Sequence, residues 1–281
     1  MPAAIVTDST SDIEPERART LGIEVVPLFI LFGERSYRDY VDLSRAQFYE
    51  KLAREKVLPI TSQPTASMFE EAFAKHAAAG EDILCITIAQ TLSGTINAAR
   101  AAAQKFPDAR IELFDSQTAA GGLGLQVLRA VEMAGGGVPT SQIIAQLTRD
   151  RELQRLYAVA PDLSHLVRTG RIGRARAAFG TLMKLVPVLR LRDGVVEAEA
   201  TVRTLRRAQE VMIDASLREV GDRNSARVMV MHTQAPDLAQ RVLEAFLAQL
   251  GGNPKFVEIL EAGPAIATHA GAGAVGIFTA G

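Results

Sequence analysis

Short apolar runs recur through the first half of the chain, and a helix-like segment follows each of them. Three such runs span residues 3–7, 83–88 and 110–114. The first two are almost uninterrupted by polar residues, which is typical of strands buried on both faces of a parallel sheet. Strands that alternate with helices predict an α/β fold. We therefore expect an α/β domain with a parallel sheet in this half.

Proline, glycine and helix-capping residues indicate where the expected strands and helices begin and end. A further strand is expected over 23–32, but Pro27 lacks an N–H and places this strand at an edge or interrupts it. A polar loop is expected over 32–41, and a hydroxyl-rich turn over 61–64. Capping boxes are expected at residues 11–14 and 44–47. Further helices are expected over 65–78, 95–106 and 140–150, with another that contains Gly121 and ends at Gly135–Gly137.

From about residue 156 the pattern changes to short strands that include a hairpin. Asp193-Gly194 stands between two apolar runs, which is a strong hairpin signal. Further strands are expected over 156–160, 226–231, 256–260 and 274–279, with helices over 175–185, 204–220 and 236–250. A short helix and a basic turn are expected over 163–172. We therefore expect two domains, 1–155 with the α/β fold and 156–281 with an α+β fold and a mainly antiparallel sheet. The boundary is approximate and allows a discontinuous arrangement.

Composition excludes several classes of function. The net charge is −1 and no single-sign block occurs, which argues against nucleic acid and anionic membrane surfaces as partners. Cys85 is the single cysteine, so a disulfide framework is excluded, and neither it nor the four histidines show metal-ligand spacing. No apolar stretch approaches the roughly 20 residues that span a bilayer. We expect a cytoplasmic protein without a metal, a cofactor or a stable membrane insertion.

Polar residues gather where three of the predicted strands end. They are Asp8-Ser9, Ser93-Gly94-Thr95 and Asp115-Ser116. Open α/β sheets bind ligands outside the carboxyl ends of their strands, and a helix N-terminus favours an anion such as a carboxylate or phosphate. Simpler explanations stay open, because Ser93 or Thr95 could be a helix N-cap and Asp8 could cap its own turn.

A set of short segments, in this order and spacing, resembles the DegV family of bacterial fatty-acid-binding proteins over almost the whole chain. They are Asp8-Ser9-Thr10-Ser11-Asp12, Val26-Pro27-Leu28, Thr61-Ser62-Gln63-Pro64, Leu92-Ser93-Gly94-Thr95, Asp115-Ser116, Gly170-Arg171-Ile172, Asp193-Gly194, Val202-Arg203-Thr204 and His269-Ala270-Gly271-Ala272-Gly273. Each segment is weak alone, and the combination is specific.

The resemblance implies a non-catalytic protein that holds a long-chain fatty acid, such as palmitate or stearate, in an apolar tunnel between two domains. It further implies that Thr61 and Ser93 hold the carboxylate, while Arg171, Arg203 and His269 support the head group. The same strand-end residues would support the site: Asp8, Ser9, Ser62, Gly94, Thr95, Asp115 and Ser116. The implied partner is a separate ATP-dependent fatty acid kinase subunit, which would convert the carboxylate into an acyl-phosphate.

The chain departs from the family pattern at several positions. Thr169 stands where the family usually has glycine, Val186 where it has lysine, and Ala272 where it has proline. Ala89 and Gln90 replace serines that commonly precede Leu-Ser-Gly-Thr. These departures bear on partner docking and on the shape of the head-group site.

Two other functions remain as alternatives. One is an acyl- or phosphoryl-transfer enzyme in which Ser93 or Asp8 is the nucleophile and His269 the base. Against it, the chain contains no Gly-x-Ser-x-Gly elbow and no Gly-x-x-x-x-Gly-Lys phosphate loop. The other is a lipid sensor that acts on a partner protein, which would use the same tunnel. Arg171 and Arg203 could also be ordinary surface ion pairs, and His269 could belong to a tight turn of Gly and Ala.

Overall fold

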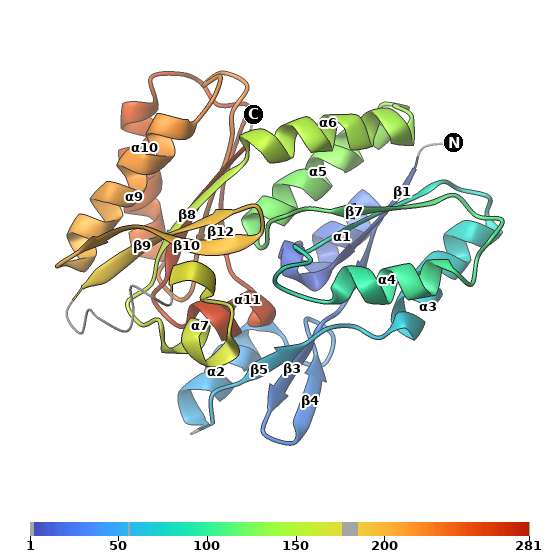
Figure 1. Cartoon of the computed structure of the whole chain (residues 1–281), viewed down its shortest axis with the longest axis horizontal. Coiled ribbons are helices and arrows are strands. Elements are labelled where there is room, and N and C mark those ends of the chain that lie inside the picture. Colours follow the sequence, from blue (N-terminus) through green and yellow to red (C-terminus); the bar gives the residue numbers. More distant parts are fainter. Residues whose placement is uncertain (1–2, 56, 176–184, 281) are drawn as a thin grey trace. The chain divides into compact units, whose positions relative to one another are not determined.

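The computed structural model describes residues 3–55, 57–175 and 185–280. These residues form two compact units (Figure 1). The N-terminal unit comprises Met1–Arg151 together with Gly263–Ala265, and the C-terminal unit comprises Glu152–Ala262 with Ile266–Gly281. The chain thus leaves the N-terminal unit and returns to it for a short segment near residue 264.

A parallel sheet is the centre of the N-terminal unit. Its strand order is β2-β1-β6-β7, and all of its pairings are parallel. The strands are β1 (Ala4–Asp8), β2 (Ile23–Val26), β6 (Ile83–Thr87) and β7 (Ile111–Asp115). Every residue of β6 is buried, because the strand lies inside the sheet and is covered on both faces. The expected α/β fold class is confirmed.

Helices pack on this sheet through small and aromatic side chains. The helices in this part of the chain are α1 (Pro15–Leu21), α2 (Arg45–Arg54), α3 (Ala66–Ala78), α4 (Thr95–Ala103), α5 (Gly121–Gly135) and α6 (Thr140–Leu153); of these, α2 packs elsewhere, on the small sheet described below. Phe69 and Phe73 of α3 form one core cluster with Val6, Cys85 and three alanines of α4, which are Ala98, Ala99 and Ala102. Helix α5 packs against β1 and β6. Helix α4 was expected over 95–106, but in the structure it is shorter and ends at Ala103.

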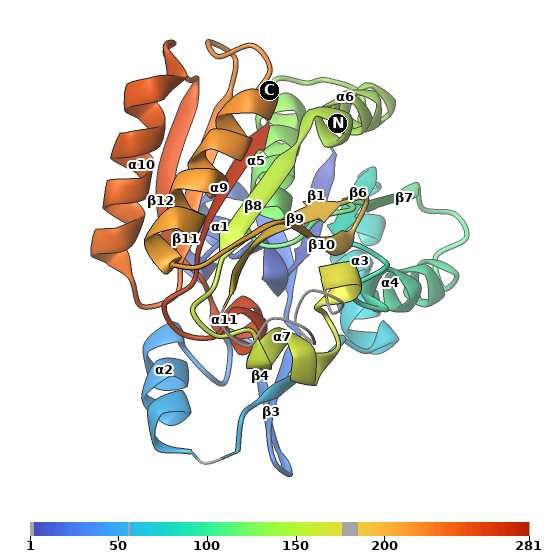
Figure 2. The same cartoon turned by 60° about the vertical axis from the view of Figure 1, so that its left-hand side comes forward.

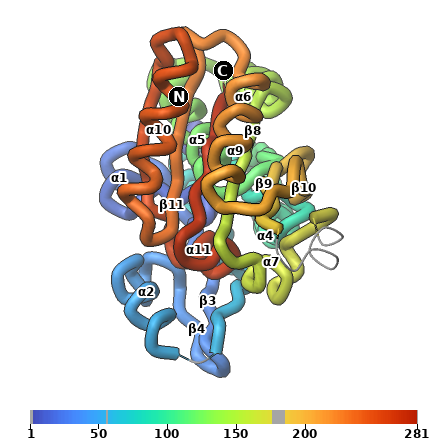
Figure 3. The backbone as a smooth tube through the Cα atoms, turned by 90° about the vertical axis from the view of Figure 1, so that its left-hand side faces the viewer, coloured from blue at the N-terminus to red at the C-terminus, as the bar shows by residue number. Residues whose placement is uncertain are grey.

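A small antiparallel sheet follows β2, where the sequence analysis was partly wrong. Its order is β4-β3-β5, from β3 (Phe29–Phe32), β4 (Arg35–Arg38) and β5 (Ile60–Ser62). The apolar run is interrupted at Pro27, as expected, but the loop predicted over 32–41 contains β4, and the predicted turn begins within β5. Both strands are short and largely solvent-facing, so neither shows an apolar pattern. Helix α2 packs on this sheet through Phe32 and Phe48 (Figure 3).

Of the two capping boxes that the sequence predicted, one is present in the structure and the other is not. The capping box at Ser44 and Gln47 is formed in full. The one expected over 11–14 is wrong, because Ser9–Ser11 form a short 3₁₀ helix and α1 begins at Pro15 after Glu14. Proline suits the first turn of a helix, since its missing N–H has no partner there in any case.

The C-terminal unit contains a six-stranded sheet of order β10-β9-β8-β13-β11-β12. Every pairing in it is antiparallel except that of β11 with β12, which confirms the expected mainly antiparallel sheet. The strands are β8 (Arg155–Val159), β9 (Val186–Arg192), β10 (Val195–Val202), β11 (Arg227–His232), β12 (Phe256–Glu261) and β13 (Val275–Ala280). Asp193 and Gly194 both have positive φ, as the predicted two-residue hairpin turn requires.

Two long helices cover one face of this sheet. They are α9 (Leu205–Glu219) and α10 (Pro236–Leu250), which lie side by side and bury Met212 and Phe246 against Tyr157 and Val228 (Figure 2). The shorter helices are α7 (Ser164–Thr169) and α11 (Pro264–Ala270). The helix predicted over 175–185 lies, apart from its ends, outside the described residues.

We expect Phe73→Ala to destabilise the protein by about 3–5 kcal/mol, the usual cost of a buried phenylalanine truncation. Phe73 is fully buried and contacts the rings of both Phe69 and Phe106. Urea unfolding followed by circular dichroism measures the change. Val57→Ala is the control, since Val57 is 52% exposed. A loss below about 1 kcal/mol for Phe73→Ala would mean that this cluster does not hold the unit together.

Candidate functional site

The parallel register brings the three strand ends to one edge of the N-terminal sheet. Thr7 pairs with Ile86, and Thr87 with Asp115. Asp8, the loop after β6 and Asp115 therefore share the edge at which α/β sheets bind ligands.

Asp8 organises the backbone at this edge. It is fully buried, and its Oδ2 accepts the Ile88 N–H at 2.8 Å. Its Oδ1 accepts the Thr10 N–H at 3.0 Å and also the Thr10 hydroxyl. The neighbouring Ser9 Oγ accepts the Leu28 N–H at 3.0 Å. Of the two interpretations, the structure therefore favours capping and backbone organisation for this pair.

Asp115 and Ser116 have the same organising role on the other side of the loop after β6. Asp115 Oδ1 accepts the N–H groups of Gln90 at 3.2 Å and Gln117 at 3.0 Å. The Ser116 hydroxyl donates to the Thr118 carbonyl at 3.1 Å. These contacts hold the loop that leads to Ser93.

Ser93 and Thr95 are not the N-caps of α4. The N-cap is Gly94, and no side chain caps the helix there. The hydroxyls of Ser93 and Thr95 instead form a hydrogen bond with each other at 2.9 Å. Thr95 is buried and Ser93 half-buried, so Ser93 is the more accessible of this hydroxyl pair.

The segment that carries Thr61 meets the segment that carries Ser93. Thr61 pairs with Ile30 in the small sheet and is half-buried, while Ser62 is exposed. A Cβ at Gly94 would lie 2.0 Å from Oε1 of Gln63, so the end of the Gln63 side chain lies directly against the backbone of Gly94. The structure thereby brings together two motifs that are distant in sequence. Sequence analysis missed Gln63 as their point of contact.

A buried carboxyl cluster in the N-terminal unit was also missed. It consists of Asp8, Asp12 and Asp39. Asp12 Oδ1 accepts the Gly263 N–H at 2.9 Å and the Tyr40 hydroxyl at 3.3 Å. A Cβ at Gly263 would lie 2.3 Å from that hydroxyl. Asp12 thus fastens the returning segment, a role that no local pattern around residue 12 indicates.

Burial controls the charge of this cluster. The pKa of Asp12 is raised to about 7, mainly by burial and in smaller part by the nearby charge of Asp8, while the Gly263 N–H and the Arg45 charge oppose the increase. Burial also raises the pKa of Asp8 and Asp39. Like charges in a desolvated site disfavour ionisation of each other, so the cluster favours protonated carboxyls.

In the C-terminal unit, His269 and Arg171 lie close together. His269 is in the last turn of α11, not in the backbone-dense turn expected from its neighbours. Its Nδ1 lies 2.8 Å from the Thr169 hydroxyl, and Arg171 donates to the Thr169 carbonyl. Arg203 is exposed after β10, and the contacts that link His269 with Arg171 do not include it.

His269 is neutral at physiological pH. Burial lowers its pKa to about 3, and electrostatic repulsion from Arg171 and His165 contributes. A neutral imidazole cannot offset negative charge as a cation. His269 therefore contributes no positive charge here, and Arg171 is a permanent cation beside it.

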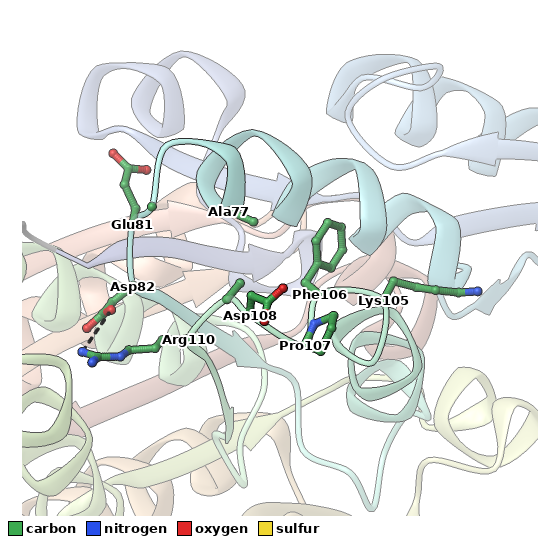
Figure 4. Close-up of a pocket in the computed structure, with 10 residues that line it drawn as sticks. Ala77, Glu81, Asp82, Lys105, Phe106, Pro107, Asp108 and Arg110 are labelled. Carbon is green, nitrogen blue, oxygen red and sulfur yellow. Dashed lines mark ion pairs between the residues drawn. The ribbon is translucent and has the colours of Figure 1, made fainter.

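A pocket of about 430 Å³ lies at the opposite edge of the N-terminal sheet, before β6 and β7 begin (Figure 4). Phe106 and Pro107 line it together with several charged side chains, including an Asp82–Arg110 ion pair at 3.9 Å. So many charged groups do not suit an acyl chain. Among the described helices, none has the length and apolarity needed to cross a membrane.

We expect stability to fall as the pH rises from about 4 to about 7, in part because of Asp12. Its pKa is about 7 in the folded protein and 3.8 ordinarily, so the unfolded chain releases this proton first. The stabilisation is full below the lower value and is lost through the higher one. The difference corresponds to about 4 kcal/mol.

Urea unfolding of the wild type and of Asp12→Asn across this pH range measures the contribution. Asparagine keeps an oxygen for the Gly263 N–H but does not titrate, so the variant should lose part of the pH dependence. Asp237→Asn is the control for the change of charge, since Asp237 is exposed. Parallel curves for wild type and Asp12→Asn would contradict the assignment.

Comparisons with known proteins agree over the whole chain. The model of the DegV family matches residues 2–281. A DegV domain-containing protein of Deinococcus radiodurans is 37% identical over 279 residues, which cover 99% of this chain and 98% of that protein. A fatty-acid-binding DegV family protein from Thermus thermophilus has a solved structure with a TM-score of 0.92 at 32% identity, covering 100% of this chain and 99% of that one. DegV from Bacillus subtilis, a fatty-acid-binding protein, gives a TM-score of 0.89 at 28% identity over 100% and 99%. The chain therefore belongs to the DegV family.

Proposed function

We propose that this protein binds a long-chain fatty acid, with the carboxylate held by the hydroxyls of Thr61 and Ser93. The observation that carries the proposal is the contact between Gln63 and Gly94, which joins the two hydroxyl-bearing segments at the sheet edge. Two relatives that bind fatty acids, at 32% and 28% identity over nearly their whole length, support it.

Hydroxyls suit this task chemically. A carboxylate accepts hydrogen bonds only, and a hydroxyl can donate one without the desolvation cost of a buried ion pair. The apolar tail supplies most of the affinity, at roughly 0.8 kcal/mol for each buried methylene. A tail of about 16 carbons then contributes on the order of 10 kcal/mol before the cost of binding. We therefore propose palmitate or stearate as the ligand, with its tail in the apolar tunnel that the family resemblance implies.

The bound fatty acid would be presented to a separate kinase subunit. The sequence contains no Gly-x-x-x-x-Gly-Lys loop, so ATP would have to be held elsewhere or in another way. Phosphorylation of the carboxylate develops negative charge, which Arg171 and Arg203 would stabilise. Val186 and Ala272 stand where the family usually has lysine and proline, and both replacements bear on how the kinase subunit would dock.

The enzymatic alternative has less support. Both oxygens of Asp8 accept hydrogen bonds, and the residue is fully buried, which does not suit a nucleophile that must meet a substrate. His269 has a pKa of about 3, far below the value near the working pH that an effective general base needs. A non-catalytic carrier therefore fits the residues better than an acyl- or phosphoryl-transfer enzyme.

We expect Ser93→Ala and Thr61→Ala each to weaken palmitate binding by about 10- to 100-fold. Each variant removes a hydrogen bond to a charged group, which is worth about 1.5–3 kcal/mol. Delipidated full-length protein is titrated with palmitate by calorimetry, and Ser141→Ala, at an exposed position of α6, is the control.

Mass spectrometry of an organic extract of the purified protein tests the ligand itself. One dominant long-chain fatty acid at near equimolar amount would support the proposal and identify the chain. An empty extract, with no palmitate or stearate binding in the titration, would overturn it. A Ser93→Ala variant that binds normally but loses turnover of an acyl substrate would favour the enzyme.

A further inference from the structure

We propose that Thr169 is a positioning residue that holds His269 in one neutral tautomer, with the proton on Nδ1 and the acceptor lone pair on Nε2. The two residues are 100 positions apart in the sequence. Thr169 is the last residue of α7 and His269 is the penultimate residue of α11.

The hydrogen-bond count around the Thr169 hydroxyl fixes the direction of each bond. Its Oγ1 lies 2.8 Å from the carbonyl oxygen of His165, 3.4 Å from that of Leu166 and 2.8 Å from Nδ1 of His269. A hydroxyl has one proton to donate, and a carbonyl oxygen can only accept. The hydroxyl must therefore donate to His165, because two oxygens without a proton between them would repel each other at this distance. It follows that Oγ1 accepts from His269, so Nδ1 is the nitrogen that carries the proton.

The surroundings keep this geometry in place. Thr169 is 8% exposed, and its bond to the carbonyl four residues earlier is a common one for threonine in a helix. His165 Nδ1 lies 3.1 Å from the Thr268 carbonyl, so α7 and α11 are joined a second time. A Cβ at Gly271 would lie 2.9 Å from the His165 ring. The imidazole and the hydroxyl are thus held by packed helices, not by a flexible loop.

The tautomer decides what His269 can bind. A neutral ring with its proton on Nδ1 can only accept at Nε2, so its partner there must be a donor such as a hydroxyl or a guanidinium. Nε2 therefore cannot donate a hydrogen bond to a carboxylate or phosphoryl oxygen. Within the described part of the chain, Arg171 and His165 are the charged or titratable groups that act on the ring, and both disfavour a second proton. Arg171 is itself anchored on the Thr169 carbonyl.

Thr169 therefore positions both His269 and Arg171. Through its hydroxyl, Thr169 makes His269 an acceptor, and through its carbonyl it places the Arg171 guanidinium, which is a donor and a cation. The consequence for a fatty acid head group rests on the proposed function, whereas the tautomer itself does not. Position 169 is also a position at which the chain departs from the family pattern of glycine, which has no hydroxyl to set the tautomer.

Nitrogen-15 NMR of histidine-labelled, delipidated full-length protein tests the proposal. Long-range proton–nitrogen correlations distinguish a protonated ring nitrogen from an unprotonated one, and a His269→Gln variant identifies the signal among the four histidines. We expect the wild type at pH 7 to show a protonated Nδ1 and an unprotonated Nε2. Thr169→Ser should keep this pattern because it keeps the hydroxyl.

Thr169→Val is the matched variant that keeps the shape and removes the acceptor. A buried N–H that faces a methyl group loses its partner, so the ratio of the two tautomers should move toward Nε2–H by about 10-fold or more. A wild-type spectrum with the proton on Nε2, or a Thr169→Val spectrum identical to the wild type, would overturn the proposal. If Thr169→Val does not fold, the wild-type and Thr169→Ser spectra still decide the tautomer. The samples contain no lipid, so failure here is separate from failure to bind a fatty acid.

Discussion

The buried carboxyl of Asp8 is the interaction on which the candidate site depends. It bridges the end of β1 and the residue after β6, which are 80 positions apart in the sequence, and it also fixes the turn at Thr10. The loop that carries Ser93 begins at this bridge and is held at Gln90 by Asp115. Removing a partner from a buried hydrogen-bonded group leaves the other group unsatisfied, which is the costly case. The most conspicuous acidic residues of the edge are therefore occupied in holding the backbone, and the proposed carboxylate site consists of hydroxyls.

Burial favours the neutral form of acidic and basic side chains alike. It raises the pKa of Asp12 to about 7 and lowers that of His269 to about 3. Desolvation penalises the charged form whatever its sign. A count of formal charges along the sequence therefore overstates the charge in each cluster. Arginine stays charged when it is buried because its intrinsic pKa is so high. Arg171, and not His269, can therefore stabilise an anion by its charge.

The sequence was informative where the signal is local. Strands β1 and β6, the Asp193-Gly194 hairpin and the capping box at Ser44 follow from apolar runs and turn chemistry, and the structure has them at the expected places. Strands β4 and β5 were missed because a short, exposed strand needs no apolar pattern. The resemblance named Thr61 and Ser93 but not the contact between Gln63 and Gly94, since a close approach between distant segments is a product of the tertiary fold.

The same limit explains why the partners of Asp12 and His269 could not be predicted. Asp12 binds an N–H that is 251 residues away, and His269 binds a hydroxyl that is 100 residues away. Backbone groups are present at every position, so a sequence cannot show which one a buried carboxyl accepts. Thr169 was visible only as a departure from a family pattern, without a reason. In the structure its hydroxyl has one proton, and its neighbours are two carbonyl oxygens, which can only accept, and Nδ1 of His269. This count assigns the proton of the His269 ring to Nδ1.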